Sequence, residues 1–545
     1  MGTQSHLLTI IIFLPLLGVA AILFLNRNDH VSVRRVALGT ALAEFVISLL
    51  VLPGFNSTNP NYQFEEFHRW ISIPPIHYHL GLDGISLFLV LLTTFLTPLS
   101  ILASWNSITF RTKEFFSALL ILETGLIGVF FAVDLFLFFV FWEIVLLPMY
   151  FLIGIWGHDR RIYATLKFIL YTMLGSILML VAIIWLFNIT GSFDLPEIQA
   201  RLAAGAINST RTEMLLFGAF FLAFAIKVPL FPLHTWLPDA HTEAPTAASV
   251  ILAGVMLKLG TYGMLRFCLP LFPAAAHRFA PLIGVLAIIG IVYGALVATI
   301  QPDLKRLVAY TSISHLGFVV LGIFAFNTIS IQGAVYQMLN HGVSTGMLFL
   351  SVGMLYDRRH TFEIKQYGGL ATPMPIFSSF FLFACFSSLA LPLLNGFAGE
   401  FLILIGVFER HPAWASWAST GSVLSAIYLL WAYQRVVLGE VTVEKNKSLS
   451  DASTRERIIL AVLSVVILFM GVASPLFTRR MEASADNILD LMRRNGPIDV
   501  RNAAAPAQLT SVARPLAASA STIPVPVECC RVNVKINSKK ERQNE

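Results

Sequence analysis

Residues 227–260 read KVPLFPLHTWLPDAHTEAPTAASVILAGVMLKLG, and this stretch joins two apolar runs of membrane-spanning length. Proline lacks the N–H donor and clashes with the preceding helical turn, so Pro229 and Pro232 predict a break just after Lys227. The second run follows Pro245 and contains Lys258. Backbone without helical hydrogen bonds is tolerated at membrane depth only against protein or water. The stretch therefore predicts an interrupted membrane helix beside a polar interior.

The composition of the chain indicates that lipid is its main solvent. Of 545 residues, 56% are hydrophobic and only 12% are charged, with a mean hydropathy of +0.75. Soluble proteins carry about 25% charged residues. Because so much apolar surface exceeds what one soluble core can bury, we expect an all-α polytopic membrane protein in contact with the lipid bilayer.

The cysteines indicate that this chain holds no metal or redox cofactor. Cys268 and Cys385 lie inside apolar runs, and Cys529 and Cys530 are adjacent near the C-terminus. No Cys-x-x-Cys pair or Cys/His cluster predicts a zinc or iron–sulfur site. The net charge of +6 is spread over loops and is not interpreted as a signal for nucleic acid.

The apolar runs predict about fourteen spanning helices, each needing roughly 20 residues. His6–Leu25 is expected to be the first span and not a removable signal, because no small-residue cleavage pattern follows it. The predicted spans are 6–25, 36–53, 83–104, 114–132, 135–155, 166–188, 213–232, 244–269, 280–300, 305–325, 332–356, 376–408, 414–438 and 457–476.

The basic residues of the loops predict the orientation. Most loop Lys and Arg lie in the alternate loops after spans 1, 3, 5, 9, 11 and 13. Under the positive-inside rule these loops are cytoplasmic, so both termini are expected on the periplasmic side of a bacterial inner membrane. Lys305 and Arg306, after span 9, are interpreted as ordinary cytoplasmic anchors.

The order of the spans predicts an internal repeat. Spans 4–8 (114–269) and spans 9–13 (270–440) make two five-helix units, and an odd number of spans gives them opposite orientations. The break in span 7 and a second break at 391–400, in span 12, then occupy matching fourth positions. The alternative is that these prolines only shape local packing.

The remaining segments flank the two repeats. Residues 1–113 hold the first three helices, and 441–476 hold the last one. Residues 477–545 are rich in Ala, Pro and Ser, and they are expected to form a disordered exported tail. Only 481–494 has the pattern of a short amphipathic helix.

Among the ionisable side chains within the predicted spans, five are the candidates for transport: Glu123, Glu143, Lys227, Lys258 and Glu400. Each costs roughly 2.5–3.5 kcal/mol at a helix centre, so each needs a partner, water or a function. We expect Glu143 to pair with Lys227 and the set to pass protons through the membrane. The alternative is a static ion pair that holds the helices together.

Histidines lie between these charges along the sequence. His315 falls in span 10 and His341 in span 11, while His234 and His241 lie in the connection between spans 7 and 8. A neutral imidazole donates from one nitrogen and accepts at the other, which suits proton transfer. His315, His341 and His234 are therefore predicted relay members, although any one of them can equally be a packing residue.

Several blocks of sequence are similar to one known family. Residues 232–263 resemble the antiporter-like membrane subunits of respiratory complex I, and the resemblance extends over about 75–475. Within that family the chain is most similar to the M (chain 4) type, because Glu400 stands where the other types usually carry lysine. Further matching blocks are DLKRLVAYTSISHLG (303–317), GLDGIS (81–86), FWE (141–143) and FAGEF (397–401).

The resemblance implies a proton-translocating subunit of an NADH:quinone oxidoreductase. Its partners would be other membrane subunits, including related antiporter-like ones, and NADH, FMN, iron–sulfur clusters and quinone would be bound elsewhere in the complex. The transport residues would be Glu143, Lys227, Lys258 and Glu400, with His315 and His341 as connectors. The alternatives are a subunit of a multi-subunit cation/proton antiporter, a subunit of a membrane-bound hydrogenase, or a purely structural membrane scaffold.

Overall fold

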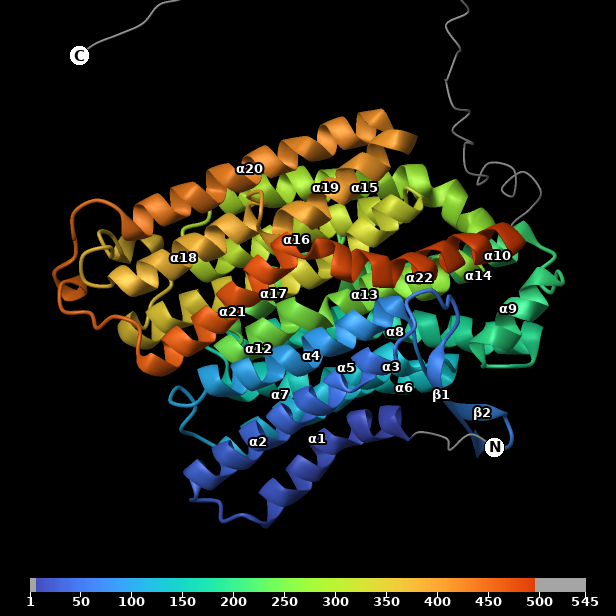
Figure 1. Ribbon diagram of the computed structural model, residues 1–545, viewed down its shortest axis with the longest axis horizontal. Helices are drawn as coiled ribbons and strands as arrows, with labels where there is room; N and C mark the ends of the chain where they lie inside the picture. Colours follow the sequence, from blue (N-terminus) through green and yellow to red (C-terminus); the bar gives the residue numbers. More distant parts are fainter. Residues whose placement is uncertain (1–5, 496–545) are drawn as a thin grey trace, which may run out of the picture. The chain divides into compact units, whose positions relative to one another are not determined.

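The computed structural model describes residues 6–495, most of which are helical (Figure 1). The N-terminal elements are α1 (Leu7–Phe24), α2 (His30–Leu49), α3 (Val51–Gly54), β1 (Gln63–Ile71), β2 (Ile76–Leu82), α4 (Gly84–Ala103) and α5 (Thr112–Phe131). Next come α6 (Leu135–Ile144), α7 (Leu146–Trp156), α8 (Arg161–Thr190), α9 (Leu195–Ala203), α10 (Thr210–Lys227), α11 (Trp236–Glu243), α12 (Thr246–Ile251), the π-helix η1 (Leu252–Met256), α13 (Lys258–Gly263), the π-helix η2 (Met264–Cys268) and α14 (Leu269–Leu271). The remainder comprises α15 (Pro273–Thr299), α16 (Leu304–Ile323), α17 (Thr328–Arg359), the 3₁₀ turn η3 (Ile364–Gln366), α18 (Pro375–Ser388), α19 (Asn395–Arg410), α20 (Pro412–Val437), the 3₁₀ turn η4 (Glu444–Asn446), α21 (Thr454–Val472) and α22 (Ser474–Asn495).

The helices have the length and hydropathy of a multi-pass membrane protein. Within residues 6–495, ten helices or continuous helical runs can cross a membrane, or eleven if α21 and α22, bent by 66°, count as one span. The predicted count of about fourteen also included α10, the α18–α19 pair and α20. These are helical, but they fall short of the length or hydropathy that defines the other ten.

A two-stranded antiparallel sheet stands between α3 and α4, where the all-α prediction had no strand. Its strands pair Phe67 with His79, and the segment is too polar to span the bilayer. Buried Glu66 on β1 accepts hydrogen bonds from the backbone N–H groups of Leu8, at 2.8 Å, and Thr9, at 3.3 Å. The strand therefore satisfies the donors that α1 leaves free at its N-terminus.

His79 fastens this hairpin to the segment before α9. Its Nδ1 lies 2.5 Å from Asp194 Oδ1, and its Nε2 lies 3.5 Å from Glu65 Oε2. Burial alone would lower the pKa of His79, but hydrogen bonding and Coulombic attraction to the two carboxylates outweigh burial and raise that pKa above its ordinary value of 6.5. The charged imidazole is thus the form that holds the hairpin in place.

Like α17, the run from α12 to α14 is deeply buried. Every residue of its apolar window is buried, and the run packs against α4, α10 and α17. Two π-helical segments interrupt it, one directly before Lys258 and one around Arg266. Arg266 is paired with Asp83, the N-cap of α4, at 2.7 Å, so this buried cation is neutralised within the fold.

The interruption predicted after Lys227 is present. Helix α10 ends at Lys227, residues 228–235 are not helical, and the short α11 follows. Gly260 on α13 lies against this break, since a Cβ there would be 2.6 Å from the Phe224 carbonyl oxygen and 3.0 Å from the Val228 nitrogen. Only glycine lets α13 approach the broken end of α10 so closely.

The second predicted interruption separates α18 from α19. Helix α18 ends at Ser388 and α19 begins at Asn395, with turns between them. Asn395 Oδ1 accepts hydrogen bonds from Ser387 Oγ at 2.7 Å and Ser344 Oγ at 3.2 Å, and its Nδ2 donates to the Asn340 carbonyl at 3.3 Å. One buried amide therefore ties the break to α17.

The amphipathic helix predicted at 481–494 is longer than expected. It is α22, which starts at Ser474, packs against α4, α14 and α17, and buries Met481, Ala485, Ile488 and Met492 (Figure 1). Residues 477–495 of the predicted exported tail are therefore helical. Residues 496–545 lie outside the described part of the chain.

Candidate functional site

Lys258 lies at the centre of the buried run, at the first position of α13. Its side chain is fully buried, and Nζ donates hydrogen bonds to the Ala253 carbonyl oxygen and to His341 Nδ1, the latter at 2.6 Å. Ala253 belongs to η1 and His341 to α17. A buried ammonium is costly unless it is hydrogen-bonded, and these two acceptors reduce that cost.

Two histidines and a glutamate continue from Lys258. The rings of His341 and His315 lie 5.7 Å apart, nearly perpendicular, and His315 Nε2 lies 3.9 Å from Glu400 Oε1. Each side chain comes from a different helix, in the order α13, α17, α16 and α19. We call Lys258, His341, His315 and Glu400 the buried polar file, and all four are at most 3% exposed.

Glu400 is held by neutral donors. Gln337 Nε2 donates to Oε1 at 3.2 Å, and Ser422 Oγ donates to Oε2 at 3.1 Å. Asn340 in turn donates to Gln337 Oε1 at 3.2 Å. A Cβ on Gly399 would lie 2.3 Å from that same oxygen, so a larger residue there would displace the Gln337 amide that holds Glu400. The carboxyl group is thus oriented by neutral amide and hydroxyl groups and faces the histidines.

Lys227 and Glu143 are neighbours but form no direct ion pair within residues 6–495. Lys227 Nζ is buried without a hydrogen-bond partner and lies 4.9 Å from the centre of the Trp142 ring. Glu143 is half-buried at the last turn of α6, and its Oε1 is also unpartnered and buried. The two groups still interact electrostatically. The predicted ion pair is not formed: Lys227 lies over an aromatic face, and we call the two separated groups the open Glu143–Lys227 pair.

Glu123 belongs to a separate pair of carboxyl groups. It lies on α5, 1% exposed, and interacts electrostatically with the fully buried Glu44 of α2. Neither carboxyl group makes a well-aligned hydrogen bond in the described part of the chain, although the Thr97 hydroxyl lies close enough to act on Glu123. No hydrogen bond among those residues joins Glu123 to the buried polar file. Glu44 was not among the sequence candidates, although it stands inside the apolar run 36–53.

His234 and His241 lie apart from the buried polar file. His234 is buried in the break after α10, between the rings of Phe231 (5.6 Å) and Tyr293 (5.1 Å). His241 is fully buried in α11, stacked 4.6 Å from Phe349, and lies close enough to Lys305 and Lys258 to interact with both electrostatically. The structure thus brings His241, rather than His234, into the surroundings of Lys258.

The interpretation of Lys305 as a surface anchor is wrong. Lys305 is 2% exposed, and its Nζ donates to the carbonyl oxygens of Thr242, at 3.3 Å, and of Ala244. These carbonyls lie at the C-terminal end of α11, where a cation complements the helix dipole. Sequence position after a spanning run did not distinguish a cation that turns inward from one that faces the aqueous phase.

A polar hollow lies on the same side of the molecule as Lys305. Its volume is about 480 Å³, and its walls include Ser107, His158, Thr246 and Tyr356. His158 Nδ1 lies 3.1 Å from Tyr356 Oη. Burial, with the nearby charge of Lys305, lowers the pKa of His158 to about 4. The imidazole is therefore neutral near pH 7 and can both donate and accept a proton.

No group of three or more His, Cys, Asp or Glu side chains within residues 6–495 could hold a metal ion. The expectation that cofactors lie in other subunits stays a prediction.

The site is a row of buried ionisable side chains between interrupted membrane helices, which defines a proton-translocating membrane protein as the class. Comparison with known proteins gives the family. The family model for the NADH:quinone oxidoreductase/Mrp antiporter transmembrane region matches residues 132–425, and the model for the amino terminus of NADH-ubiquinone oxidoreductase chain 4 matches residues 7–129. The chain belongs to this family of antiporter-like membrane subunits.

Individual relatives agree over most of the chain. NADH-quinone oxidoreductase subunit M of Rhodobacter capsulatus is 47% identical, over 87% of this chain and 94% of the relative. NADH-ubiquinone oxidoreductase chain 4 of Marchantia polymorpha is 44% identical, over 88% of this chain and 96% of the relative. A chain in the structure of respiratory complex I from Thermus thermophilus with bound NADH superposes with a TM-score of 0.81 at 30% identity, covering 90% of this chain and all of that one.

Proposed function

We propose that this chain is the proton-translocating M subunit of an NADH:quinone oxidoreductase. It moves protons through its interior while electron transfer from NADH to quinone takes place in other subunits. The observation that carries the proposal is the buried polar file, in which Lys258, His341, His315 and Glu400 join four helices through successive polar neighbours. A static scaffold has no need for four ionisable groups in succession at a cost of roughly 2.5–3.5 kcal/mol each.

The open Glu143–Lys227 pair is the switch of this proposal. When the pair closes, the carboxylate favours the protonated lysine; when it opens, the proton is less favoured there and passes onward. Lys227 sits at the broken end of α10, where residues 228–235 can move without disturbing a helical hydrogen-bond ladder. Lys258 then receives the proton at the start of the buried polar file, and His341 and His315 pass it on to Glu400.

The arrangement in the membrane completes the proposal. The chain crosses a bacterial inner membrane about fourteen times. Residues 114–269 and 270–440 are inverted five-helix repeats, flanked by 1–113 and 441–476, and both termini are periplasmic. The matching interruptions at Lys227 and at 389–394 support the repeat. Its partners are the other membrane subunits, and NADH, FMN, iron–sulfur clusters and quinone bind outside this chain.

The test is NADH-driven, quinone-dependent proton uptake by inverted membrane vesicles that contain the fully assembled complex. Glu143→Gln and Lys227→Ala are expected to abolish pumping and to suppress quinone reduction. Glu197→Gln, on the exposed side of α9, is the matched control and should leave both activities unchanged. Normal pumping by both variants in assembled complex would show that the buried charges are structural.

A sodium/proton antiporter subunit is the remaining alternative. It predicts cation-driven proton movement in the same vesicles without NADH. Glu400 argues against it, because the lysine usual in those relatives is replaced by a carboxylic acid. Measuring the response to a sodium gradient with and without NADH separates the two functions.

A further inference from the structure

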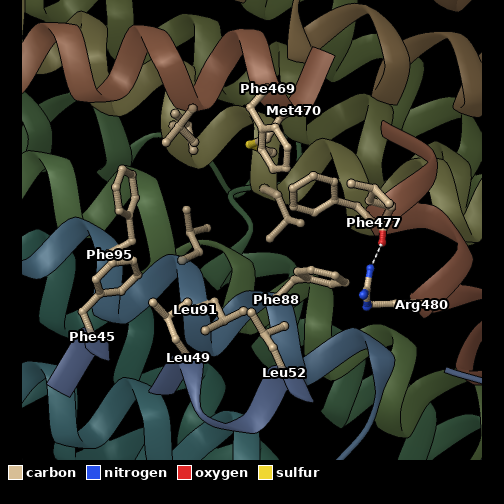
Figure 2. Close-up of a pocket in the computed structure, with 15 residues that line it drawn as sticks. Phe45, Leu49, Leu52, Phe88, Leu91, Phe95, Phe469, Met470, Phe477 and Arg480 are labelled. Atoms are coloured by element: carbon tan, nitrogen blue, oxygen red, sulfur yellow. Dashed lines mark hydrogen bonds between the residues drawn. The ribbon is translucent and has the colours of Figure 1, made fainter. Parts of the chain in front are cut away.

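An apolar groove runs between α2–α3, α4, α17, α21 and α22, outside the buried polar file (Figure 2). Its volume is about 420 Å³, and every residue that lines it is apolar except Arg480. Figure 2 shows Phe45 and Phe95 at one end and Phe88, Phe477 and Arg480 at the other. The groove is therefore lined by apolar side chains and has one positively charged side chain, Arg480, at its end.

The end that carries Arg480 is built by a close helix approach. A Cβ on Gly84 would lie 2.0 Å from the Arg480 carbonyl oxygen, so α22 crosses the start of α4 in backbone contact. The Gly84 N–H also donates to Ser484 Oγ at 2.9 Å. These contacts hold the first turns of α22 across the groove, just beyond the end of α21.

The groove has the size and lining of a small-molecule site. Its volume of 420 Å³ lies in the roughly 300–1,000 Å³ range of such sites, which are lined mostly by apolar side chains. Phe469 and Leu476 on its rim are each 51% exposed, so one side of the groove is left uncovered by this chain. A flexible hydrocarbon chain fits a groove of this size and composition.

Arg480 favours an occupant of the groove that carries a negative charge. One guanidinium nitrogen donates to the Leu476 carbonyl at 2.7 Å, and no carboxylate among residues 6–495 lies within ion-pair distance of Arg480. The side chain is only partly buried and stands past the last residue of α21, Val472, where a spanning helix reaches the head-group region. Arginine there attracts anionic head groups and can bind a phosphate through two parallel hydrogen bonds.

We propose that this groove binds one acyl chain of an anionic phospholipid whose phosphate is held by Arg480. The lipid packs α22 and α21 against α4 and fills a space that would otherwise leave its aromatic lining without contacts. The site is independent of the proton-translocating function, because none of its lining residues belongs to the buried polar file or to the Glu143–Lys227 pair.

The test is photo-crosslinking in the intact, delipidated complex. The complex is reconstituted with phosphatidylglycerol, or with phosphatidylcholine as the zwitterionic comparison, each carrying a diazirine on one acyl chain. Labelled peptides are then mapped by mass spectrometry. Phosphatidylglycerol is expected to label peptides that contain 88–95 and 469–477. Arg480→Gln should lower this labelling about fivefold, to the level of phosphatidylcholine, as expected for one cation near the membrane surface.

Two further variants distinguish binding in the groove from general contact between the protein and lipid. Arg479→Gln changes a neighbouring exposed arginine that does not line the groove, and it should leave labelling unchanged. Leu91→Trp narrows the groove and should reduce labelling by both lipids. Equal labelling in Arg480→Gln and wild type, labelling spread evenly over lipid-facing helices, or displacement of the probe by excess quinone would each overturn the proposal.

Discussion

Replacing His341 by phenylalanine tests the buried polar file most directly. The phenyl ring keeps the volume of the imidazole but removes Nδ1, which accepts the 2.6 Å hydrogen bond from Lys258. A hydrogen bond to a charged group contributes about 1.5–3 kcal/mol. Since each 1.36 kcal/mol is a factor of ten in an equilibrium between protonation states, losing the bond destabilises the protonated lysine about 10- to 150-fold. The phenyl ring also has no atom that takes up or releases a proton, so transfer through this position should be lost.

The assay is proton uptake per NADH oxidised, in inverted vesicles that contain equal amounts of assembled complex. Tyr336→Phe is the matched control, because it removes another buried hydrogen bond from α17, the one from Tyr336 Oη to the Met470 carbonyl, outside the file. We expect pumping to fall in His341→Phe and to persist in Tyr336→Phe. Unchanged pumping rate and stoichiometry in His341→Phe would refute the file as the proton path.

Three further outcomes follow from the packing and charges. Asp83→Asn leaves Arg266 buried without its carboxylate and should cost about 3–5 kcal/mol, measured as a lower Tm of the complex. Gly260→Ala should reduce the yield of assembled complex on native gels, whereas Gly218→Ala should not, because its Cβ meets no atom within 4 Å. The raised pKa of His79 contributes stability that is complete below pH 6.5 and is lost as pH rises through that pKa, so limited proteolysis should cut the hairpin faster at about pH 9 than at about pH 6.

The positions of the long helices and of the breaks between them were predictable from the sequence. Apolar runs placed the long helices, and prolines placed the breaks after Lys227 and before Asn395, because both signals are local. The charged candidates were found by their cost in lipid, which needs no knowledge of the fold. Lys258 and Glu400, 142 positions apart by their residue numbers, end in one file because α16 and α17 supply histidines between them.

Features that depend on side-chain direction were not predictable. Lys305 follows a spanning run as a surface anchor would, yet it turns inward to the end of α11. Gln337 and Ser422 orient Glu400 but are ordinary polar residues in the sequence, and only the three-residue spacing of Gln337 and Asn340 on one helix face hinted at a polar stripe. The hairpin was not predicted because Glu66, which joins it to the rest of the fold, is a buried acid whose partners are backbone N–H groups of α1.

The π-helix η1 has a consequence for how the chain tolerates changes in length. Each hydrogen bond of a π turn spans five residues instead of four, so η1 carries a surplus residue relative to an α-helix. Because the wider turn absorbs that residue, deleting one position from Leu252–Met256 would restore ordinary α-helical winding and leave the flanking turns in register. The change would fall on the π turn itself, which supplies the Ala253 carbonyl that accepts a hydrogen bond from Lys258 Nζ. A single-residue gap in this segment should therefore preserve the direction of Lys258 while changing the position of its carbonyl partner.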